Sequence, residues 1–214
     1  MSDQLWLEKY RPKLLAEVVG NAQILETLRE LSRENNIPNL ILSGPPGCAK
    51  TTSILALCRE ILGEHFGEAT IELNASDERG LNVVREKIKI FAERMVRLPP
   101  GKHKVVILDE ADSLTSSAQQ ALRMIISNYS STTRFVFSCN TSSKIIEPIQ
   151  SRCGMLRFSK LKDEDILKFL LRIVDEENQR ARAKGQGREE TNLQRRSSTT
   201  RKAWRRSSIL PMVI

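Results

Sequence analysis

Apolar and polar residues follow one another along the chain in blocks that predict alternating strands and helices. Short, nearly continuous apolar runs such as 40–42 and 105–108 are typical of strands covered on both faces of a parallel sheet. Five strands are expected, at 40–43, 69–74, 104–109, 133–139 and 155–158. Apolar residues spaced by three and four predict helices between them. The alternation predicts an α/β fold with a five-stranded parallel sheet.

The expected helices each have one apolar face. They are predicted over 24–31, 50–62 and 81–96, from Ser116 onward, and over 163–178. In the third of these, the period places Ile88, Phe91 and Met95 inward. Its basic residues then lie on the outer face, either as an ordinary solvated surface or as a stripe that follows a phosphate backbone.

A small loop rich in glycine and proline separates the first strand from the next helix. Its backbone N–H groups can curl round a polyphosphate, and the helix that follows directs its positive end at the anion. Lys50 is then expected to reach the β- and γ-phosphates, and Thr51 to hold Mg²⁺. An ordinary Gly/Pro turn is the alternative. The residues assigned to nucleotide binding here are Gly44, Pro45, Pro46, Gly47, Cys48, Ala49, Lys50, Thr51 and Thr52.

Ala49 departs from the phosphate-loop pattern, which has glycine directly before the lysine. The extra methyl group costs little if φ is negative at this position. It costs about 1 kcal/mol or more if φ is positive.

Two carboxylates follow the apolar strand that ends near residue 108. Ligands bind open α/β sheets at the carboxyl ends of the strands, so Asp109 is expected beside the phosphate loop, holding Mg²⁺ through water. Glu110 is then placed to orient and deprotonate an attacking water. The alternative is a strand end that meets solvent.

Asn140 closes the strand at 133–139 and is expected near the two carboxylates. Its amide can hydrogen-bond both a water and a γ-phosphate, which would report which nucleotide is bound. An Asn that caps the next turn is the competing interpretation.

The formal net charge of +8 is concentrated in one segment. Residues 179–214 carry ten basic and two acidic side chains, so the rest of the chain is balanced. DNA binding by the first 178 residues therefore requires a local basic surface. The four cysteines form no CxxC pair, which indicates reduced thiols and no zinc site. No apolar run approaches membrane-spanning length, and no membrane partner is expected.

Several motifs in this order resemble the small subunits of replication factor C, the eukaryotic sliding-clamp loader among the AAA+ ATPases. The likeness runs from about Trp6 to Glu177, so the expected fold is a P-loop NTPase of this class with the first helix of the helical lid. The motifs that carry it are Trp6–Pro12, Asn39–Gly47, Leu73–Gly80, Ile107–Asp112 and Cys139–Cys153.

The resemblance implies ATP and Mg²⁺ as cofactors, with ATP held between neighbouring subunits of a hetero-pentamer. It implies that Tyr10, Arg11 and Val19 line the adenine pocket and that Asn140 is the sensor-1 residue. Arg152, in Ser-Arg-Cys, would reach the neighbouring subunit's ATP. Asn74 would restrain Glu110 until DNA binds. Lys50, Glu110, Asn140 and Arg152 form the expected catalytic set.

The same resemblance implies a nuclear protein that loads the sliding clamp onto primed double-stranded DNA in replication and repair. Helices on the inside of the family's spiral track the DNA backbone. The candidates for this contact are Arg79, Arg85, Lys89 and Arg123.

The expected organisation is an ATP-binding domain over 1–160, the start of the lid over 161–178, and a basic tail over 179–214. The tail departs from the family's lid and collar. It is interpreted either as a disordered segment or as the product of a reading-frame shift. Two other functions remain open: a truncated, non-catalytic isoform that binds partners or nucleic acid, and another AAA+ DNA motor such as a branch-migration helicase.

Overall fold

A computed structural model describes residues 5–76 and 81–180. Five strands form one sheet in the order β2-β3-β4-β1-β5, and every neighbouring pair is parallel. The predicted five-stranded parallel sheet is confirmed. The strands are β1 (Leu40–Ser43), β2 (Thr70–Asn74), β3 (Lys104–Asp109), β4 (Thr133–Cys139) and β5 (Gly154–Arg157).

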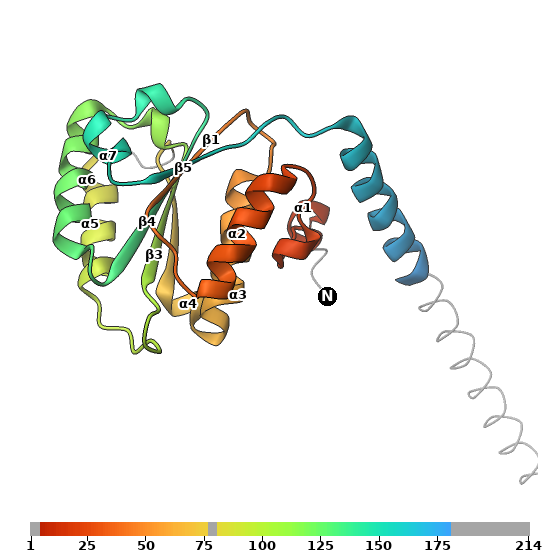
Figure 1. Cartoon of the computed structure of the whole chain (residues 1–214), viewed down its shortest axis with the longest axis horizontal. Coiled ribbons are helices and arrows are strands. Elements are labelled where there is room, and N and C mark those ends of the chain that lie inside the picture. The colour runs from red at the N-terminus through yellow and green to blue at the C-terminus, as the bar shows by residue number, and fades with distance from the viewer. Residues whose placement is uncertain (1–4, 77–80, 181–214) are drawn as a thin grey trace, which may run out of the picture. The chain divides into compact units, whose positions relative to one another are not determined.

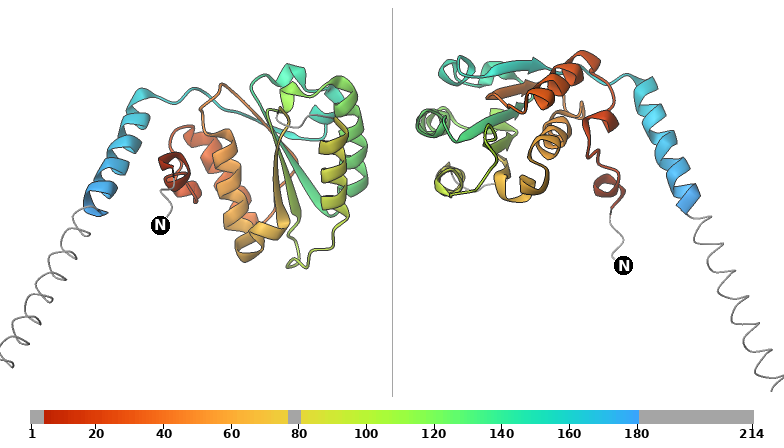
Figure 2. Two further views of the ribbon diagram at one scale, coloured as in Figure 1. Left: turned by 180° about the vertical axis from the view of Figure 1, so that it is seen from behind. Right: turned by 60° about the horizontal axis from the view of Figure 1, so that its bottom comes forward.

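Helices cover both faces of the sheet, with α2 and α3 on one side and α5 and α6 on the other (Figures 1 and 2). The α-helices are α1 (Trp6–Lys9), α2 (Ala22–Glu34), α3 (Lys50–Leu62), α4 (Phe66–Ala69), α5 (Leu81–Glu93), α6 (Ser116–Tyr129) and α7 (Glu147–Gln150). Short 3-10 turns are η1 (Leu15–Glu17), η2 (Gly63–His65), η3 (Ala111–Ser113) and η4 (Ser142–Lys144).

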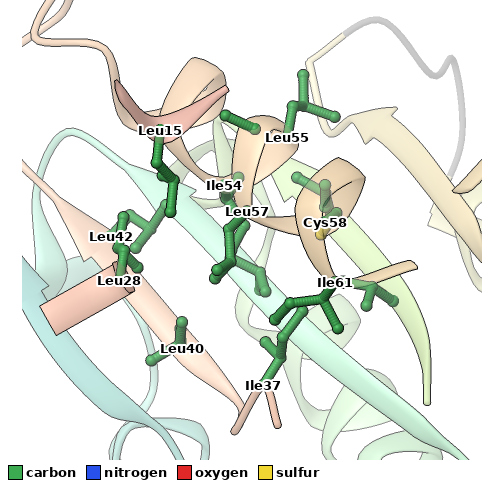
Figure 3. Close-up of a cluster of buried hydrophobic side chains, with 14 of the residues drawn as sticks. Leu15, Leu28, Ile37, Leu40, Leu42, Ile54, Leu55, Leu57, Cys58 and Ile61 are labelled. Atoms are coloured by element: carbon green, nitrogen blue, oxygen red, sulfur yellow. The ribbon is translucent and has the colours of Figure 1, made fainter. Parts of the chain in front are cut away.

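The alternation of side chains along the strands gives the sheet one core on each face. Leu42, Ile107 and Val136 pack with the apolar sides of α2 and α3, as Figure 3 shows for part of this cluster. On the opposite face, Leu108 and Phe137 pack with the apolar residues of α5 and α6. Because the strands are all parallel, the polar residues at their carboxyl ends lie along one edge of the sheet.

The third expected helix is shorter than its apolar period indicated, since α5 ends at Glu93. Lys104, at the start of β3, donates from Nζ to the carbonyl oxygens of Phe91, Ala92 and Arg94. A buried cation therefore satisfies carbonyl groups that the helix end leaves without partners. The prediction that Met95 points inward is wrong, because this side chain lies beyond the helix and is 95% exposed.

Two strand boundaries also differ slightly from the predicted ones. Ala69 is the last residue of α4, so β2 begins at Thr70. The fifth strand runs from Gly154 to Arg157, and the Phe158 N–H continues its pairing by donating to the Ser43 carbonyl oxygen at 2.7 Å.

The described chain ends in a helix over 163–180. Two compact units divide the described chain between Ile166 and Leu167. The side chains of Leu167, Leu170 and Val174 on this helix are exposed. The predicted basic tail, apart from its first residues, lies outside the described residues. Among the described helices, none has both the length and the apolar character needed to cross a membrane.

Candidate functional site

A cavity of about 300 Å³ opens at the carboxyl ends of β3 and β4 and the N-terminus of α3. Both signs of charge line it, since Arg11 and Lys50 occur there together with Asp109 and Glu110. Its full lining comprises Arg11, Pro46, Gly47, Cys48, Ala49, Lys50, Thr51, Thr52, Asp109, Glu110, Ser138, Cys139 and Asn140. Most residues predicted for the phosphate loop and the two strand ends therefore meet in one place.

The loop that leads from β1 to α3 passes very close to β5. A Cβ atom at Gly44 would clash with the carbonyl oxygen of Phe158, the residue directly after β5, so a side chain is excluded there. Ala49, the residue before α3, has φ 70° and ψ 24°, which is the left-handed region. Of the two cases considered for Ala49, the structure shows the costly one, with about 1 kcal/mol or more of backbone strain.

The N-terminus of α3 has no side-chain cap at Ala49. The first backbone N–H groups of a helix lack intrahelical acceptors and carry partial positive charge. In α3 these groups border the cavity, because residues 46–52 line it. This arrangement suits an anion such as a phosphate group.

Lys50 is 8% exposed, and its ammonium group lies between the loop and β4. It donates to the carbonyl oxygens of Gly44 at 2.6 Å and Pro45 at 2.9 Å. It also donates to Asn140 Oδ1 at 3.2 Å. The cation is thus held at the base of the loop, next to the strand-end amide of Asn140, which the sequence predicted to lie near the two carboxylates.

Asp109, the last residue of β3, is hydrogen-bonded to the first turn of α3. Thr51 Oγ1 donates to Asp109 Oδ2 at 2.7 Å, and the Glu110 N–H donates to Asp109 Oδ1 at 3.0 Å. Glu110 itself has φ 51° and lines the cavity. A neutral hydroxyl and a carboxylate side by side are ligand types that Mg²⁺ accepts.

Two cysteines border the cavity without offering reactive thiolates. Burial raises the pKa of Cys48, and the nearby Lys50 charge only partly opposes this effect. Burial also raises the pKa of Cys139, and the charge of Asp112 adds to it.

Of the three residues expected at an adenine pocket, Arg11 lines the cavity and the other two do not. Arg11 lines the cavity and also lies 3.8 Å from Glu72 as an ion pair. Tyr10 and Val19 are not among the described residues that line the cavity. The Tyr10 ring instead makes an edge contact with Trp6, at a centroid distance of 6.2 Å.

Two residues with predicted roles, Arg152 and Asn74, are not among the described residues that line this cavity. Arg152 follows α7, is exposed, and donates from Nη1 to the Pro148 carbonyl oxygen at 2.6 Å. Asn74 accepts hydrogen bonds at Oδ1 from the Ser76 N–H at 2.9 Å and from Ser76 Oγ at 2.8 Å.

The structure describes the side chains of two of the four DNA-contact candidates, Lys89 and Arg123. Lys89 is exposed on α5 and lies 3.8 Å from Glu93. Arg123 is half-buried on α6. Arg79 lies outside the described residues, as does the side chain of Arg85.

Sequence reasoning missed three residues that shape the site. The carboxylate of Asp112 accepts from the Asn140 N–H at 3.3 Å. Gln119 is 2% exposed and links α6 to the segment after Asn140. Ser138 lines the cavity, and its hydroxyl is buried. The repeated acid at 109 and 112 was a usable signal for Asp112, whereas Gln119 and Ser138 carry no local motif.

A comparison with protein families matches residues 40–161 to the family described as "ATPase family associated with various cellular activities (AAA)". Curated relatives are similar over most of the chain. Replication factor C subunit 2 of Arabidopsis thaliana is 62% identical over 79% of this chain and 51% of its own length. Replication factor C subunit 4 of Saccharomyces cerevisiae is 56% identical over 79% and 52%.

An archaeal relative, the replication factor C small subunit of Sulfolobus acidocaldarius, is 50% identical over 81% of this chain and 53% of its own length. The chain therefore spans about half the length of the curated relatives it matches. Among solved structures, the RuvB Holliday junction branch migration motor of Thermotoga maritima matches with a TM-score of 0.62 at 17% identity, over 79% of this chain and 55% of that one. This last likeness shows the fold alone.

Proposed function

Because the chain belongs to the AAA family of ATPases, we propose that its cavity binds ATP with Mg²⁺ and that it acts as a small subunit of a replication factor C clamp loader. The observation that carries the proposal is the meeting of Lys50, Thr51, Asp109 and Asn140 around one cavity at the open N-terminus of α3. The identity of 50–62% to replication factor C subunits supports the choice within the family.

Each residue has a distinct role in this proposal. The N-terminus of α3 and Lys50 bind the phosphates, and Asn140 senses the γ-phosphate through the amide that contacts Lys50. Glu110 lines the same cavity and takes a proton from the attacking water. Arg11 approaches the base, whereas Tyr10 and Val19 contribute to the adenine pocket only with a change in their present positions.

Mg²⁺ fits the residues that are present. Thr51 offers a hydroxyl and Asp109 a carboxylate 2.7 Å apart, and oxygen ligands of this kind are what Mg²⁺ prefers. When bound, the ion would neutralise charge on the β- and γ-phosphates. Thr51 and Asp109 would fix the position of the ion.

Arg152 suits a role in trans. Its side chain is exposed on a segment that does not border this chain's own cavity, which supports a contact with ATP on a neighbouring subunit. The proposal therefore includes other clamp-loader subunits, the sliding clamp and primed DNA as partners, and a nuclear location. Lys89 and Arg123, with Arg79 and Arg85, remain the proposed DNA contacts.

An arginine supplied by a neighbour accelerates hydrolysis by roughly 10³- to 10⁵-fold in related enzymes. The chain alone is thus expected to bind ATP and to hydrolyse it very slowly. Titration of a fluorescent ATP analogue, with and without Mg²⁺, tests binding by the full chain and by Lys50→Met. Lys50→Met removes the cation and should abolish binding in the titrated range.

Hydrolysis is then measured with the partner subunits, the clamp and primed DNA added. The expected result is a large stimulation that Arg152→Ala reduces while leaving binding by the chain intact. Binding that is equal in the wild type and Lys50→Met would refute the assignment of the cavity. Rapid hydrolysis by the isolated chain would refute the role of a neighbouring subunit.

A further inference from the structure

The hydroxyl of Ser138 is a buried polar group with no hydrogen-bond partner among the described residues. The residue is 0% exposed, yet it lines the cavity together with Asp109 and Thr51. A buried hydroxyl without a hydrogen-bond partner destabilises the folded chain, so such groups call for a physical explanation.

The sheet register places Ser138 on the face where the metal ligands are proposed. Leu108 pairs with Phe137, so the following residues, Asp109 and Ser138, are neighbours across β3 and β4. Side chains alternate along a strand, and Val136 belongs to the core that packs with α3. Ser138 lies two residues further and therefore faces α3, whose first turn carries Thr51.

A second buried hydroxyl without a hydrogen-bond partner offers a comparison with Ser138. Thr70 Oγ1 is also buried without a partner, but Thr70 lies at the first position of β2 and is not part of the cavity lining. The cavity edge of β2 is at the other end, where Asn74 pairs with Asp109. Of these two orphan groups, Ser138 is the one beside the proposed metal ligands.

We propose that Ser138 is a positioning residue for Mg²⁺, accepting a hydrogen bond from a water that the ion carries. The inference rests on the proposed binding of Mg²⁺-ATP. Mg²⁺ keeps several of its waters in protein sites, and their protons need acceptors. The two carboxylate oxygens of Asp109 already accept from Thr51 Oγ1 and from the Glu110 N–H. Ser138 Oγ, by contrast, takes part in no hydrogen bond with the described residues, so it is free to accept one from such a water.

The test compares the full wild-type chain with Ser138→Ala and with Thr70→Val as a matched loss of an orphan hydroxyl. Binding of a fluorescent ATP analogue is measured in EDTA and then at increasing free Mg²⁺. Ser138→Ala should raise the Mg²⁺ concentration for half-maximal effect by roughly 10-fold, with binding in EDTA unchanged. Thr70→Val should change neither quantity. Both variants should unfold in EDTA at a temperature no lower than the wild type, because each loses an unpaired buried hydroxyl.

Several results would overturn the inference. A Mg²⁺ midpoint for Ser138→Ala within twofold of the wild type would leave the hydroxyl without a role in metal binding. If Ser138→Ala weakened nucleotide binding in EDTA as much as in Mg²⁺, the role of the hydroxyl would be structural. A wild-type chain that binds nucleotide without any Mg²⁺ effect would also overturn it, while the binding part of the proposed function would stand. A chain that binds no nucleotide would refute both.

Discussion

Thr51 Oγ1 and Asp109 Oδ2 lie 2.7 Å apart, and this hydrogen bond joins the first turn of α3 to the end of β3. The carboxylate thereby orients the hydroxyl, so that the lone pairs of Thr51 Oγ1 stay available for Mg²⁺ while Asp109 can hold the ion through a water. The hydroxyl of Thr51, and not its methyl group, makes this contact.

Replacing Thr51 with valine is expected to weaken Mg²⁺-supported ATP binding by roughly 10-fold or more, because the branched shape remains but the hydroxyl is lost. Thr51→Ser keeps the hydroxyl and should stay close to the wild type. Calorimetric titration with ATP at fixed Mg²⁺ measures both. If valine and serine variants bind alike, the hydroxyl is not part of the metal site.

Ala49→Gly is expected to stabilise the chain. The residue has φ 70°, where the Cβ atom costs about 1 kcal/mol and glycine does not. A gain of this size raises the melting temperature by about 2–4 °C in a domain of this size. Thermal unfolding followed by circular dichroism measures the change.

The control for Ala49 is Ala56→Gly, within the buried middle of α3. There φ is helical, so glycine should lower the free energy of unfolding by about 1 kcal/mol. Opposite signs for the two substitutions would identify backbone conformation as the cause. A loss at both positions would show that position 49 relaxes to negative φ in solution.

The fold and the phosphate loop were predictable because their signals are local. The apolar runs of β1 and β3 and the glycine, proline and lysine of residues 44–50 each determine structure within a few residues. Met95 was mispredicted because the end of α5 depends on Lys104, which lies on a different element. The spacing of apolar residues that is typical of a helix continues in the sequence after α5 has ended.

The same distinction applies within the site. Asp109 and Asn140 end two strands, so sheet topology alone brings them to one edge. The roles of Gln119 and Ser138 depend on which groups surround them after folding, and no spacing in the sequence encodes this. The sign of φ at Ala49 was likewise left open by the sequence and is decided by the turn into α3.

Cysteine reactivity should be very low at neutral pH and rise with pH. Burial raises the pKa of Cys153 to about 12, although the charge of Arg152 opposes the shift. Burial also raises the pKa of Cys58 to about 12. At pH 8 the thiolate fraction is then on the order of 10⁻⁴, and the thiolate is the form that reacts. Alkylation of half-buried Cys153 should be about 10³-fold slower than that of a free thiol.

Iodoacetamide labelling followed by peptide mass spectrometry checks this expectation between pH 7 and pH 10. Because the raised pKa lies above this range, the rate should increase about tenfold for each pH unit. The chain unfolded in guanidinium is the control and should react at the rate of ordinary cysteine. Rapid labelling of Cys153 at pH 7 in the folded chain would contradict the effect of burial.

Gln119→Met is expected to lower the free energy of unfolding by about 3 kcal/mol. Gln119 Nε2 donates to the carbonyl oxygens of Leu114 at 3.1 Å and Lys144 at 3.0 Å, and Oε1 accepts from the Ile146 N–H at 2.8 Å. Methionine has a similar size but forms none of these bonds, so three backbone groups, one buried and two partly buried, would lose a partner. Urea unfolding measures the loss.

The neighbouring Gln120 offers a matched control, because it is exposed on the same helix. Gln120→Met should change the free energy of unfolding by no more than about 0.5 kcal/mol. Gln119 also ties the segment after Asn140 to the helix that follows Glu110, so its replacement should weaken ATP binding even at temperatures where the chain is fully folded. Equal effects of the two substitutions would mean that the buried amide does not hold these segments together.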